Sequence, residues 1–370
     1  MIAGAVVIGG GGTAGHVLPG LSVARALVAS GRAPSEITFV GAARGQESEL
    51  VPAAGFEVVL LPGRGIQRKL TVDNVASAWG ILRAVVSCIA LFGRTRPAVV
   101  VTLGGYAALA PTIAAIVWRV PIVVTEQNAC AGASNRIAGR FARACAVPFE
   151  GTDLPRAVVT GNPVRPEILA VATEPGARTR ARAELGIDPG RRLIAVFSGS
   201  LGSRRINEAA AGLAQRWAGR SDLAIHQVVG RRDFDGAPRP GPGMALDWTV
   251  VDYEQRMDLL MAAADVAVSR AGGSTVAELA VMGLPSVLVP LPIAPRDHQT
   301  ANARALAGVG GAVLVPDEEL DVDRLEAVMD GLLATEGRLA EMSAAARALG
   351  RPDAAERVAS LVEQAAAVGS

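Results

Sequence analysis

The chain has 370 residues, of which 50% are hydrophobic and 19% carry a formal charge. This length is typical of two ordinary domains, and the apolar content allows each to bury a core. The net charge is only +1, which excludes a global field that would attract nucleic acid, so any basic patch has to be local. Cys88, Cys130 and Cys145 have neither a disulfide nor a metal-ligand pattern, and the chain opens without a charged segment and apolar core. We therefore expect a protein of the reducing cytosol with no secretion signal.

Short apolar runs alternate with longer helical patterns along the whole chain. Alternation of this kind predicts parallel sheets that are covered by helices on both faces. The expected strands are residues 5–8, 37–40, 98–102, 121–125 and 157–160, followed by 193–198, 224–229, 248–251, 266–269 and 286–290.

The first strand runs into G-G-G-G-T-A-G-H, residues 9–16, before a helix. Gly10, Gly12 and Gly15 have the spacing of a dinucleotide-binding loop, but that motif also needs an acid at the end of the second strand to hold a ribose. Here that strand ends V-G-A-A at residues 40–43. A nicotinamide-dependent oxidoreductase is therefore disfavoured, and we expect the loop to admit a bulky, phosphate-bearing acceptor.

No charge occurs between Pro97 and Trp118, a length close to that of a membrane span. The segment begins with a β-branched run and contains Gly104, Gly105 and Pro111. These residues favour a buried strand, a glycine turn and an apolar helix over a transmembrane helix.

Proline, glycine and charge gather in V-T-G-N-P-V-R-P-E at residues 159–167, and an arginine-rich polar stretch follows as far as Arg192. This composition is typical of a joint between domains. We expect an α/β protein of two Rossmann-like domains that face one another across a cleft. From the residues alone, either domain could receive the final helical pattern at 352–367.

The second half places R-A-G-G-S-T-V-A-E, residues 270–278, after a strand, where amides at a helix start favour a diphosphate. We expect Glu278 in the first turn, where it could bind ribose hydroxyls, although Thr275-x-x-Glu278 also fits a capping box. Ser200, in S-G-S-L-G-S, is either a turn former or a ligand contact. The D-F-D at 233–235 looks like a metal-binding D-x-D, but its neighbours favour an ordinary turn.

Seven motifs occur in the order, and at about the spacing, of the MurG family. They are G-G-T-A-G-H-V-L-P-G, L-G-G-Y, E-Q-N-A, T-G-N-P-V-R, S-G-S-L-G-S-R, R-A-G-G-S-T-V-A-E and D-H-Q-T-A-N-A. The chain resembles this family from about residue 4 to its C-terminus. The resemblance implies a GT-B glycosyltransferase of family 28, with an acceptor-binding and membrane-associating domain at 1–163 and a UDP-N-acetylglucosamine-binding domain at 164–350. It also implies that a helix within 351–370 packs back on the first domain.

The resemblance also implies site residues. Glu278 would bind the uridine ribose, Ser200 and Arg165 would lie by the diphosphate, and Gln299 would read sugar hydroxyls. The full donor set is Thr13, Gly15, Asn128, Arg165, Ser200, Gly272, Gly273, Ser274, Thr275, Glu278, Gln299 and Asn302. The acceptor set is Gly12, Thr13, His16, Gly104, Gly105 and Tyr106, and the catalytic set is His16, Glu126 and Asn128.

Two positions depart from the family pattern. The family often has histidine where this chain has Thr125, and the proline after the G-G-Y turn, Pro111, is one position late. Both lie on the acceptor side. A related transferase that uses the same donor with a natural-product acceptor therefore stays open, as do a UDP-N-acetylglucosamine 2-epimerase and an inactive scaffold.

The implied reaction moves N-acetylglucosamine to the 4-hydroxyl of the N-acetylmuramic acid in lipid I, with inversion, and forms lipid II. It needs a base for the alcohol and positive charge for the departing diphosphate. Arg165 and the helix start near Ser274 would supply that charge without a metal or another cofactor. His16 is the expected base, because a helix N-terminus disfavours the imidazolium. Alternatively, His16 caps the helix or binds acceptor phosphate, and Glu126 is the base or orients His16.

A lipid-borne acceptor requires contact with a bilayer. Arg64, Arg68 and Lys69 precede an apolar helix with Trp79 and Leu82, a pattern that suits an anionic lipid surface. The alternative is one more sheet-covering helix. We expect a peripheral protein on the cytoplasmic face of the cell membrane, with UDP-N-acetylglucosamine, lipid I, that membrane surface and cell-wall synthesis proteins as partners, and no nucleic acid.

Overall fold

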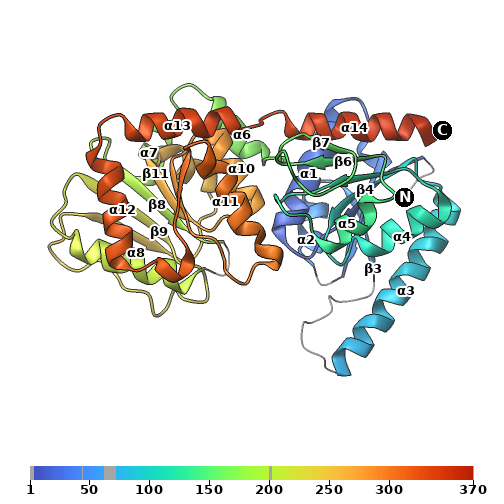
Figure 1. Cartoon of the computed structure of the whole chain (residues 1–370), viewed down its shortest axis with the longest axis horizontal. Coiled ribbons are helices and arrows are strands. Elements are labelled where there is room, and N and C mark those ends of the chain that lie inside the picture. Colours follow the sequence, from blue (N-terminus) through green and yellow to red (C-terminus); the bar gives the residue numbers. More distant parts are fainter. Residues whose placement is uncertain (1–3, 44, 62–71, 200–201, 370) are drawn as a thin grey trace. The chain divides into compact units, whose positions relative to one another are not determined.

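The protein was analysed as a computed structural model, which describes residues 4–43, 45–61, 72–199 and 202–369. The chain divides into two compact units. Unit 1 comprises Met1–Arg165 and Arg351–Ser370, and unit 2 comprises Pro166–Gly350. Each unit has its own parallel sheet with helices around it (Figure 1).

The sheet of unit 1 has seven parallel strands in the order β3-β2-β1-β4-β5-β6-β7. Their bounds are β1 Val6–Gly10, β2 Ile37–Ala42, β3 Glu57–Leu61, β4 Val99–Gly104, β5 Ile122–Thr125, β6 Ala144–Val147 and β7 Ala157–Val159. The helices are α1 Ala14–Ala29, η1 Pro34–Glu36, α2 Glu47–Ala53, α3 Val72–Thr95, α4 Leu109–Trp118, α5 Ala133–Gly139 and α14 Ala354–Gly369.

The sheet of unit 2 has six parallel strands in the order β10-β9-β8-β11-β12-β13. Their bounds are β8 Arg192–Phe197, β9 Leu223–Val228, β10 Asp247–Val251, β11 Val266–Ser269, β12 Ser286–Leu288 and β13 Ala312–Leu314. The helices are α6 Pro166–Thr173, α7 Ala177–Leu185, α8 Arg204–Arg216, α9 Met257–Ala263, α10 Gly273–Met282, η2 Pro295–Asp297, α11 His298–Gly308, η3 Asp317–Glu319, α12 Val322–Ala334 and α13 Arg338–Leu349.

The two-domain α/β prediction is confirmed, and every expected strand is present with small shifts at its ends. Three strands were missed: β3, β6 and β13. The first is an edge strand that begins with the exposed Glu57. The other two are only four and three residues long and contain alanine, which is at least as common in helices.

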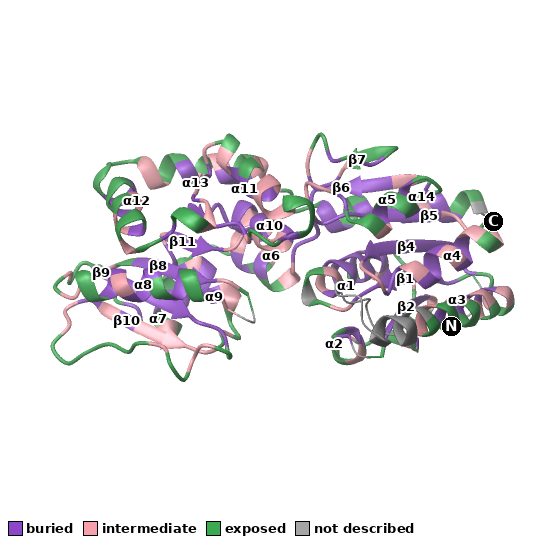
Figure 2. Ribbon diagram, turned by 60° about the horizontal axis from the view of Figure 1, so that its bottom comes forward, coloured by how far each residue is buried: buried purple, intermediate pink, exposed green. Residues whose placement is uncertain are grey.

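The central strands are buried on both faces, as the purple strands in Figure 2 show. Val99 to Leu103 of β4 and Leu193 to Phe197 of β8 are all buried. Continuous apolar strands of this kind follow from the helices that cover both faces of a parallel sheet.

The C-terminal helix α14 belongs to unit 1 and packs beside α1 (Figure 1). Its fully buried Val358 and Val362 join the core that includes Ile8 and Leu27. The Arg32 guanidinium after α1 also donates to Glu363, with Nη2 2.9 Å from Oε2. The helix is therefore part of the apolar cover of the first sheet.

The uncharged segment that begins at Pro97 forms β4, a glycine turn and α4, as predicted. Among the helices built from described residues, none is both long and apolar enough to cross a bilayer.

Candidate active site

The switch points of the two sheets position the candidate site residues. In unit 1, β1 lies between β2 and β4, and the chain continues from β1 and from β4 into helices on opposite faces of the sheet. In unit 2, β8 and β11 have the same relation. Ligands of open parallel sheets bind at such points. All four strands are followed by the glycine turns that the sequence singled out.

In unit 1, the turns after β1 and β4 pack on one another. A Cβ atom at Gly105 would lie 3.0 Å from the Gly11 carbonyl oxygen, and one at Gly12 would lie 3.5 Å from the Tyr106 ring. Gly12 and Gly105 also have positive φ angles of 94° and 76°. Larger residues would be strained here and would separate the turns. The structure thus brings together the predicted acceptor residues Gly12, Gly105 and Tyr106.

His16 lies in the first turn of α1, beside these glycine turns. Its ring is half-buried, and a Cβ atom at Gly105 would lie 3.9 Å from His16 Cε1. Nδ1 is 3.1 Å from the hydroxyl of Thr13, the residue that precedes α1. If Nδ1 carries the ring proton and donates it to Thr13, Nε2 is the basic nitrogen, and this is the tautomer that a general base needs.

The first glycine loop also rests on a carboxylate that the sequence analysis missed. Glu47, at the start of α2, is buried, and its carboxylate accepts hydrogen bonds from Gly12 N at 2.8 Å and Ala42 N at 2.7 Å. A Cβ atom at Gly11 would collide with it. The loop amide of Gly12 is thereby bound to the protein's own carboxylate, which is a further reason to disfavour a dinucleotide there.

Glu126 lies in the loop after β5, and its buried carboxylate accepts five hydrogen bonds from that loop and α5. The donors are the backbone amides of Gln127, Asn128 and Gly132 and the side-chain amides of Asn128 and Asn135. This arrangement fixes the loop and Asn128 rather than leaving a carboxylate oxygen ready for a substrate proton. It favours a positioning role for Glu126 over the base role.

The neighbouring Asn135 reaches the turn after β4. Its Nδ2 donates to Glu126 and to the Thr125 carbonyl oxygen, and a Cβ atom at Gly104 would lie 3.0 Å from that Nδ2. Asn135 Oδ1 is buried without a hydrogen-bond partner in the described part of the chain. The carboxylate of Glu126 is therefore linked through Asn135 to the glycine turn that faces His16.

Arg165 is the last residue of the first segment of unit 1 and is half-buried. It follows Asn162, whose Nδ2 lies 3.5 Å from the Gln127 carbonyl oxygen. The T-G-N-P-V-R segment is thus joined to the loop that carries Glu126.

In unit 2, Ser200 lies outside the described residues, and the contacts that can be described begin at Gly202. A Cβ atom at Gly202 would collide with the Val229 carbonyl oxygen, so only glycine fits. Ser203 accepts a hydrogen bond of 2.6 Å from Arg270, whose guanidinium also binds Asp317 at 2.6 Å. Arg270, which sequence reasoning passed over, therefore ties the turns after β8 and β11 together.

The N-terminus of α10 corrects one expectation. The helix begins at Gly273 with Gly272 as its N-cap, and it has no acidic residue in its first turn and no side-chain cap. Thr275 therefore starts no capping box, and Glu278 lies in the second turn. Glu278 is buried on this helix. Ser274 Oγ is buried and has no partner among the described atoms, which suits a ligand contact beside the first helical amides.

Gln299 and Asn302 of α11 hold the residue before the glycine turn. Gln299 Oε1 accepts hydrogen bonds from Ala271 N at 3.2 Å and Leu291 N at 2.9 Å. Asn302 Nδ2 donates to the Ala271 carbonyl oxygen at 3.1 Å. Gln299, which was predicted to bind sugar hydroxyls, and Asn302 of the predicted donor set thus position the turn before α10. Because Oε1 already accepts these two hydrogen bonds, a ligand hydroxyl would accept a hydrogen bond from Nε2 of Gln299.

The D-F-D and the two histidines of unit 2 make local contacts. Asp233 and Asp235 of the D-F-D lie in a turn, and Arg232 binds Asp233 at 2.9 Å. His226 is buried in β9, with Nε2 3.2 Å from Glu254. His298 Nδ1 is 2.8 Å from the Pro295 carbonyl oxygen. Among the described residues, no group of three or more potential ligands could hold a metal ion.

Two parallel sheets of the same strand order, each with paired glycine turns at its switch point, define the class as a GT-B glycosyltransferase. The glycosyltransferase family 28 N-terminal domain matches residues 6–147, and the glycosyltransferase family 28 C-terminal domain matches residues 193–358. The chain belongs to this family, and within it to the MurG group that its motifs indicated.

Individual relatives cover nearly the whole chain. A protein of Acidothermus cellulolyticus named UDP-N-acetylglucosamine--N-acetylmuramyl-(pentapeptide) pyrophosphoryl-undecaprenol N-acetylglucosamine transferase is 41% identical over 98% of both chains. MurG of Acinetobacter baumannii superposes with a TM-score of 0.74 at 27% identity, over 97% of this chain and 99% of that one. The glycotransferase of kitacinnamycin has a TM-score of 0.68 but only 18% identity, over 99% and 100% of the chains, and shares the fold alone.

Proposed function

We propose that this chain transfers N-acetylglucosamine from UDP-N-acetylglucosamine to the 4-hydroxyl of the N-acetylmuramic acid of lipid I, and so forms lipid II. The observation that carries this proposal is the 41% identity to a transferase of that name over 98% of both chains. The described site residues support it, because each unit has paired glycine turns at its switch point and such a transfer needs two substrate sites.

Unit 2 is the proposed donor site. The first amides of α10 and the orphan hydroxyl of Ser274 suit a diphosphate, and Glu278 one turn further on suits the ribose hydroxyls. Gln299 and Asn302 hold Ala271 and thereby aim this turn. A helix N-terminus stabilises negative charge that develops on the leaving UDP.

Unit 1 is the proposed acceptor site, with His16 as the base. In the proposed step, His16 Nε2 takes the proton of the sugar 4-hydroxyl while the oxygen attacks the anomeric carbon of the donor. The bond from that carbon to the diphosphate oxygen breaks, and its electrons leave with UDP. A single displacement inverts the α donor into a β link. Thr13 Oγ1 lies 3.1 Å from Nδ1, where a proton donated by Nδ1 leaves Nε2 as the basic nitrogen, and Glu126 fixes the loop of Asn128.

The two departures from the family pattern leave the acceptor side intact. Thr125 is buried in β5, and its carbonyl oxygen accepts hydrogen bonds from Gln127 and Asn135. Pro111 lies in the first turn of α4, and its ring packs against Gly9 of β1. Because Gly9 has no side chain, there is room for the proline at this position. The backbone contacts of the E-Q-N-A loop are thus made with threonine at position 125, which supports an acceptor site of the family's kind.

The experiment is an assay with labelled UDP-N-acetylglucosamine and a short-chain lipid I analogue. We expect a labelled lipid II product, and we expect His16→Ala to lower turnover by roughly 10²–10⁴-fold without weakening donor binding. Thr13→Val, which removes the hydroxyl at Nδ1, should shift the pH profile of turnover. Label transferred only to another acceptor, or His16→Ala turnover close to that of the unchanged chain, would contradict the proposal.

We also propose that α3 of unit 1 contacts an anionic membrane surface. Trp79, Leu82 and Val86 are exposed and lie on one face of α3, while Cys88 and Phe92 on the other face join the core. The basic residues expected before this helix, Arg64, Arg68 and Lys69, lie outside the described residues. An exposed apolar stripe on a sheet-covering helix suits partial insertion between lipid head groups.

This second proposal is tested by sedimentation with vesicles. We expect vesicles rich in phosphatidylglycerol to bind the protein at low salt, and Leu82→Ser with Val86→Ser to weaken binding. Ser87→Ala, on an exposed position of the same helix, is the control. Equal binding by all three proteins, or no binding at low salt, would refute a membrane role for α3.

A further inference from the structure

The carboxylate of Glu47 is packed among three glycines of unit 1. Gly11 lies in the first glycine loop, Gly41 in β2, and Gly45 in the loop that follows β2. A Cβ atom at any of the three would collide with the Glu47 side chain, and only 1% of Glu47 is exposed. The glycines therefore make room for a carboxylate that the fold buries, and a buried carboxylate is stable only where hydrogen bonds compensate it.

Each oxygen of this carboxylate accepts a hydrogen bond from a backbone amide. Oε2 lies 2.8 Å from Gly12 N, and Oε1 lies 2.7 Å from Ala42 N. Gly12 follows β1 and Ala42 ends β2, so one side chain fixes the spacing between the ends of two neighbouring strands. A glutamine could not make both contacts, because its amide has one acceptor atom and its NH2 group would face a second N–H donor.

The position of Gly12 in turn determines where His16 lies. Thr13 follows Gly12 directly, its carbonyl oxygen accepts a hydrogen bond of 3.1 Å from His16 N, and its Oγ1 lies 3.1 Å from His16 Nδ1. Residues 9–12 are all glycine, so the loop has no side chain of its own to hold Gly12 in place. Glu47 therefore fixes, from outside the loop, the backbone that leads to the imidazole.

We propose that Glu47 is a positioning residue for the transfer reaction. It holds Gly12, and through Gly12 it places Thr13 and the His16 ring where the acceptor hydroxyl loses its proton. This inference rests on the proposed function, in which His16 is the base. Glu47 is buried and acts through these residues rather than on the substrate. A general base has to lie within about 3 Å of the atom that it deprotonates, so a small shift of the loop lowers turnover sharply.

The test compares Glu47→Gln with Glu49→Gln, the same substitution at an exposed position of α2. With labelled UDP-N-acetylglucosamine and a short-chain lipid I analogue, we expect Glu47→Gln to lower kcat roughly 10- to 100-fold and to leave the KM for the donor unchanged. Glu49→Gln should turn over as the unchanged chain does. Gly45→Ala displaces the same carboxylate from a position outside the first glycine loop, so it should lower kcat in the same way.

A core variant separates positioning from stability. Val362→Ala removes buried methyl groups from the core of unit 1 and leaves Glu47 and the loop residues unchanged. Its unfolding midpoint should fall, while its kcat should stay near that of the unchanged chain. If Val362→Ala lost kcat as Glu47→Gln does, Glu47 would act only through stability, and the positioning role would be wrong.

A readout without substrate keeps this proposal separate from the transfer assay. The chain has three histidines, and the nitrogen NMR resonances of the His16 ring report which ring nitrogen carries the proton. We expect these resonances to shift in Glu47→Gln and Gly45→Ala but not in Glu49→Gln or Val362→Ala. Unshifted His16 resonances in Glu47→Gln, or an undiminished kcat, would overturn the positioning role. An unchanged chain that makes no lipid II would overturn the proposed function instead, and the ring resonances would still decide the role of Glu47.

Discussion

The buried side chain of Glu47 stabilises the first glycine loop. Its carboxylate is the acceptor for two backbone amides, Gly12 N and Ala42 N. In Glu47→Ala, both amides lose that acceptor, and a buried unsatisfied donor costs about 1–3 kcal/mol. We therefore expect the free energy of unfolding to fall by about 3 kcal/mol, measured by urea denaturation.

The matched control for this change is Glu49→Ala, on an exposed position of the same helix. It should leave stability nearly unchanged. If the two alanine variants were equally stable, the carboxylate of Glu47 would not be holding the loop.

Glu47 also shows where prediction from the sequence stopped. The glycine loop, His16 and the G-G-Y turn could be located, because glycines that follow apolar strands have a local pattern. The dinucleotide-binding pattern places its acidic residue at the end of the second strand, where this chain has Ala43. The carboxylate that binds Gly12 instead comes from Glu47 in the following helix, α2. Glu126, by contrast, was predicted to be a site residue, but the five hydrogen bonds to its carboxylate were not. They depend on how residues 127–135 fold back toward it. Contacts made through tertiary folding have no signature in the spacing of residues.

His226 makes stability depend on pH. Burial lowers the pKa of its imidazole below the ordinary value of about 6.5, and attraction from Glu254 opposes this only in part. Below that pH the unfolded chain binds a proton that the folded chain does not, so the free energy of unfolding falls as the pH decreases. His226→Gln should therefore lose less stability than the unchanged protein between about pH 7 and pH 5.

Denaturant titrations at several pH values measure this difference. His298→Gln is the control, because His298 is only half-buried and binds a backbone carbonyl. Parallel pH profiles for His226→Gln and the unchanged protein would show that another group is responsible.

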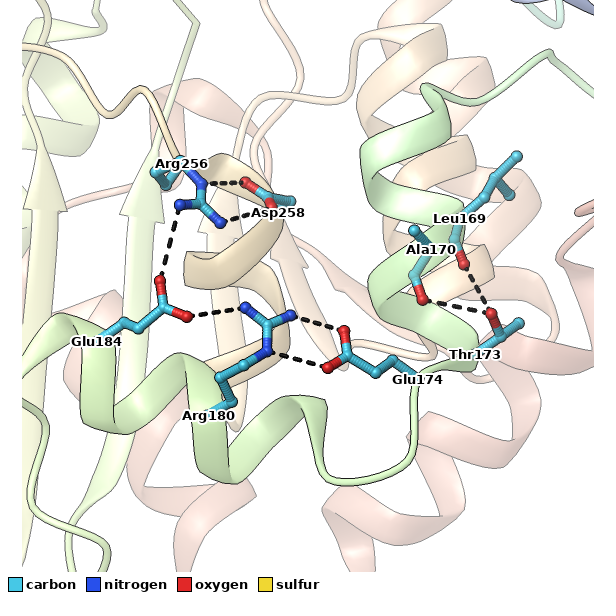
Figure 3. Close-up of polar contacts among 8 residues, drawn as sticks. All are labelled: Leu169, Ala170, Thr173, Glu174, Arg180, Glu184, Arg256 and Asp258. Atoms are coloured by element: carbon cyan, nitrogen blue, oxygen red, sulfur yellow. Dashed lines mark hydrogen bonds and ion pairs between the residues drawn. The ribbon is translucent and has the colours of Figure 1, made fainter.

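At the scale of the helix, two of the three arginines of α7 form ion pairs that differ in burial. Arg180 binds Glu174 and Glu184 at the surface, and Glu184 also meets Arg256 (Figure 3). Arg182 is buried, and it binds Asp265 at 2.7 Å and the Ala263 and Arg191 carbonyl oxygens. It thereby joins α7 to the residues that precede β8 and β11.

Arg182→Met should be the damaging change, although Arg180 has more carboxylate partners. It leaves the carbonyl oxygens and part of Asp265 without a buried donor, and removing one partner of such a pair costs about 3–5 kcal/mol. Arg180→Met removes exposed, salt-screened pairs and should change the unfolding midpoint little. Thermal and urea unfolding of both variants measure this contrast. A larger loss for Arg180→Met would reverse the order that burial predicts.

Elements were predicted more securely than their ends. Apolar runs located the strands that lie next to the switch points, because those strands are buried on both faces. The start of α10 was placed too late, since Thr275 and Glu278 fit a capping box while Gly272 is the true N-cap. A glycine N-cap leaves the first amides without a side-chain acceptor, and this is what a phosphate site requires. Capping rules derived from helix stability favour a side-chain cap, so they do not predict an N-cap that leaves the first amides open to a ligand.

At the scale of the whole molecule, the same strand order occurs twice. The order β3-β2-β1-β4-β5-β6 in unit 1 repeats as β10-β9-β8-β11-β12-β13 in unit 2. The restart of the strand pattern after residue 190 predicted two similar domains, but not their strand order. The destination of the last helix was open from composition alone, because its apolar face would cover either sheet, and only the family resemblance favoured unit 1. In the structure, Val358 and Val362 complete the core of unit 1.

This arrangement makes the two units unequal as fragments. Unit 2 is a single segment, Pro166–Gly350, with its own sheet and core, whereas unit 1 is built from two segments distant in the sequence. We expect a fragment of residues 166–350 to unfold cooperatively in urea. If the donor site lies in unit 2, UDP at a hundredfold excess over its Kd should stabilise the fragment by about 2.7 kcal/mol.

A fragment of residues 1–165 lacks the buried side chains of α14, so it should be aggregation-prone. Joining residues 351–370 to it through a flexible linker should restore cooperative unfolding. Equal stability of unit 1 with and without α14 would contradict the role assigned to this helix, and a folded 166–350 fragment that UDP does not stabilise would contradict the donor site.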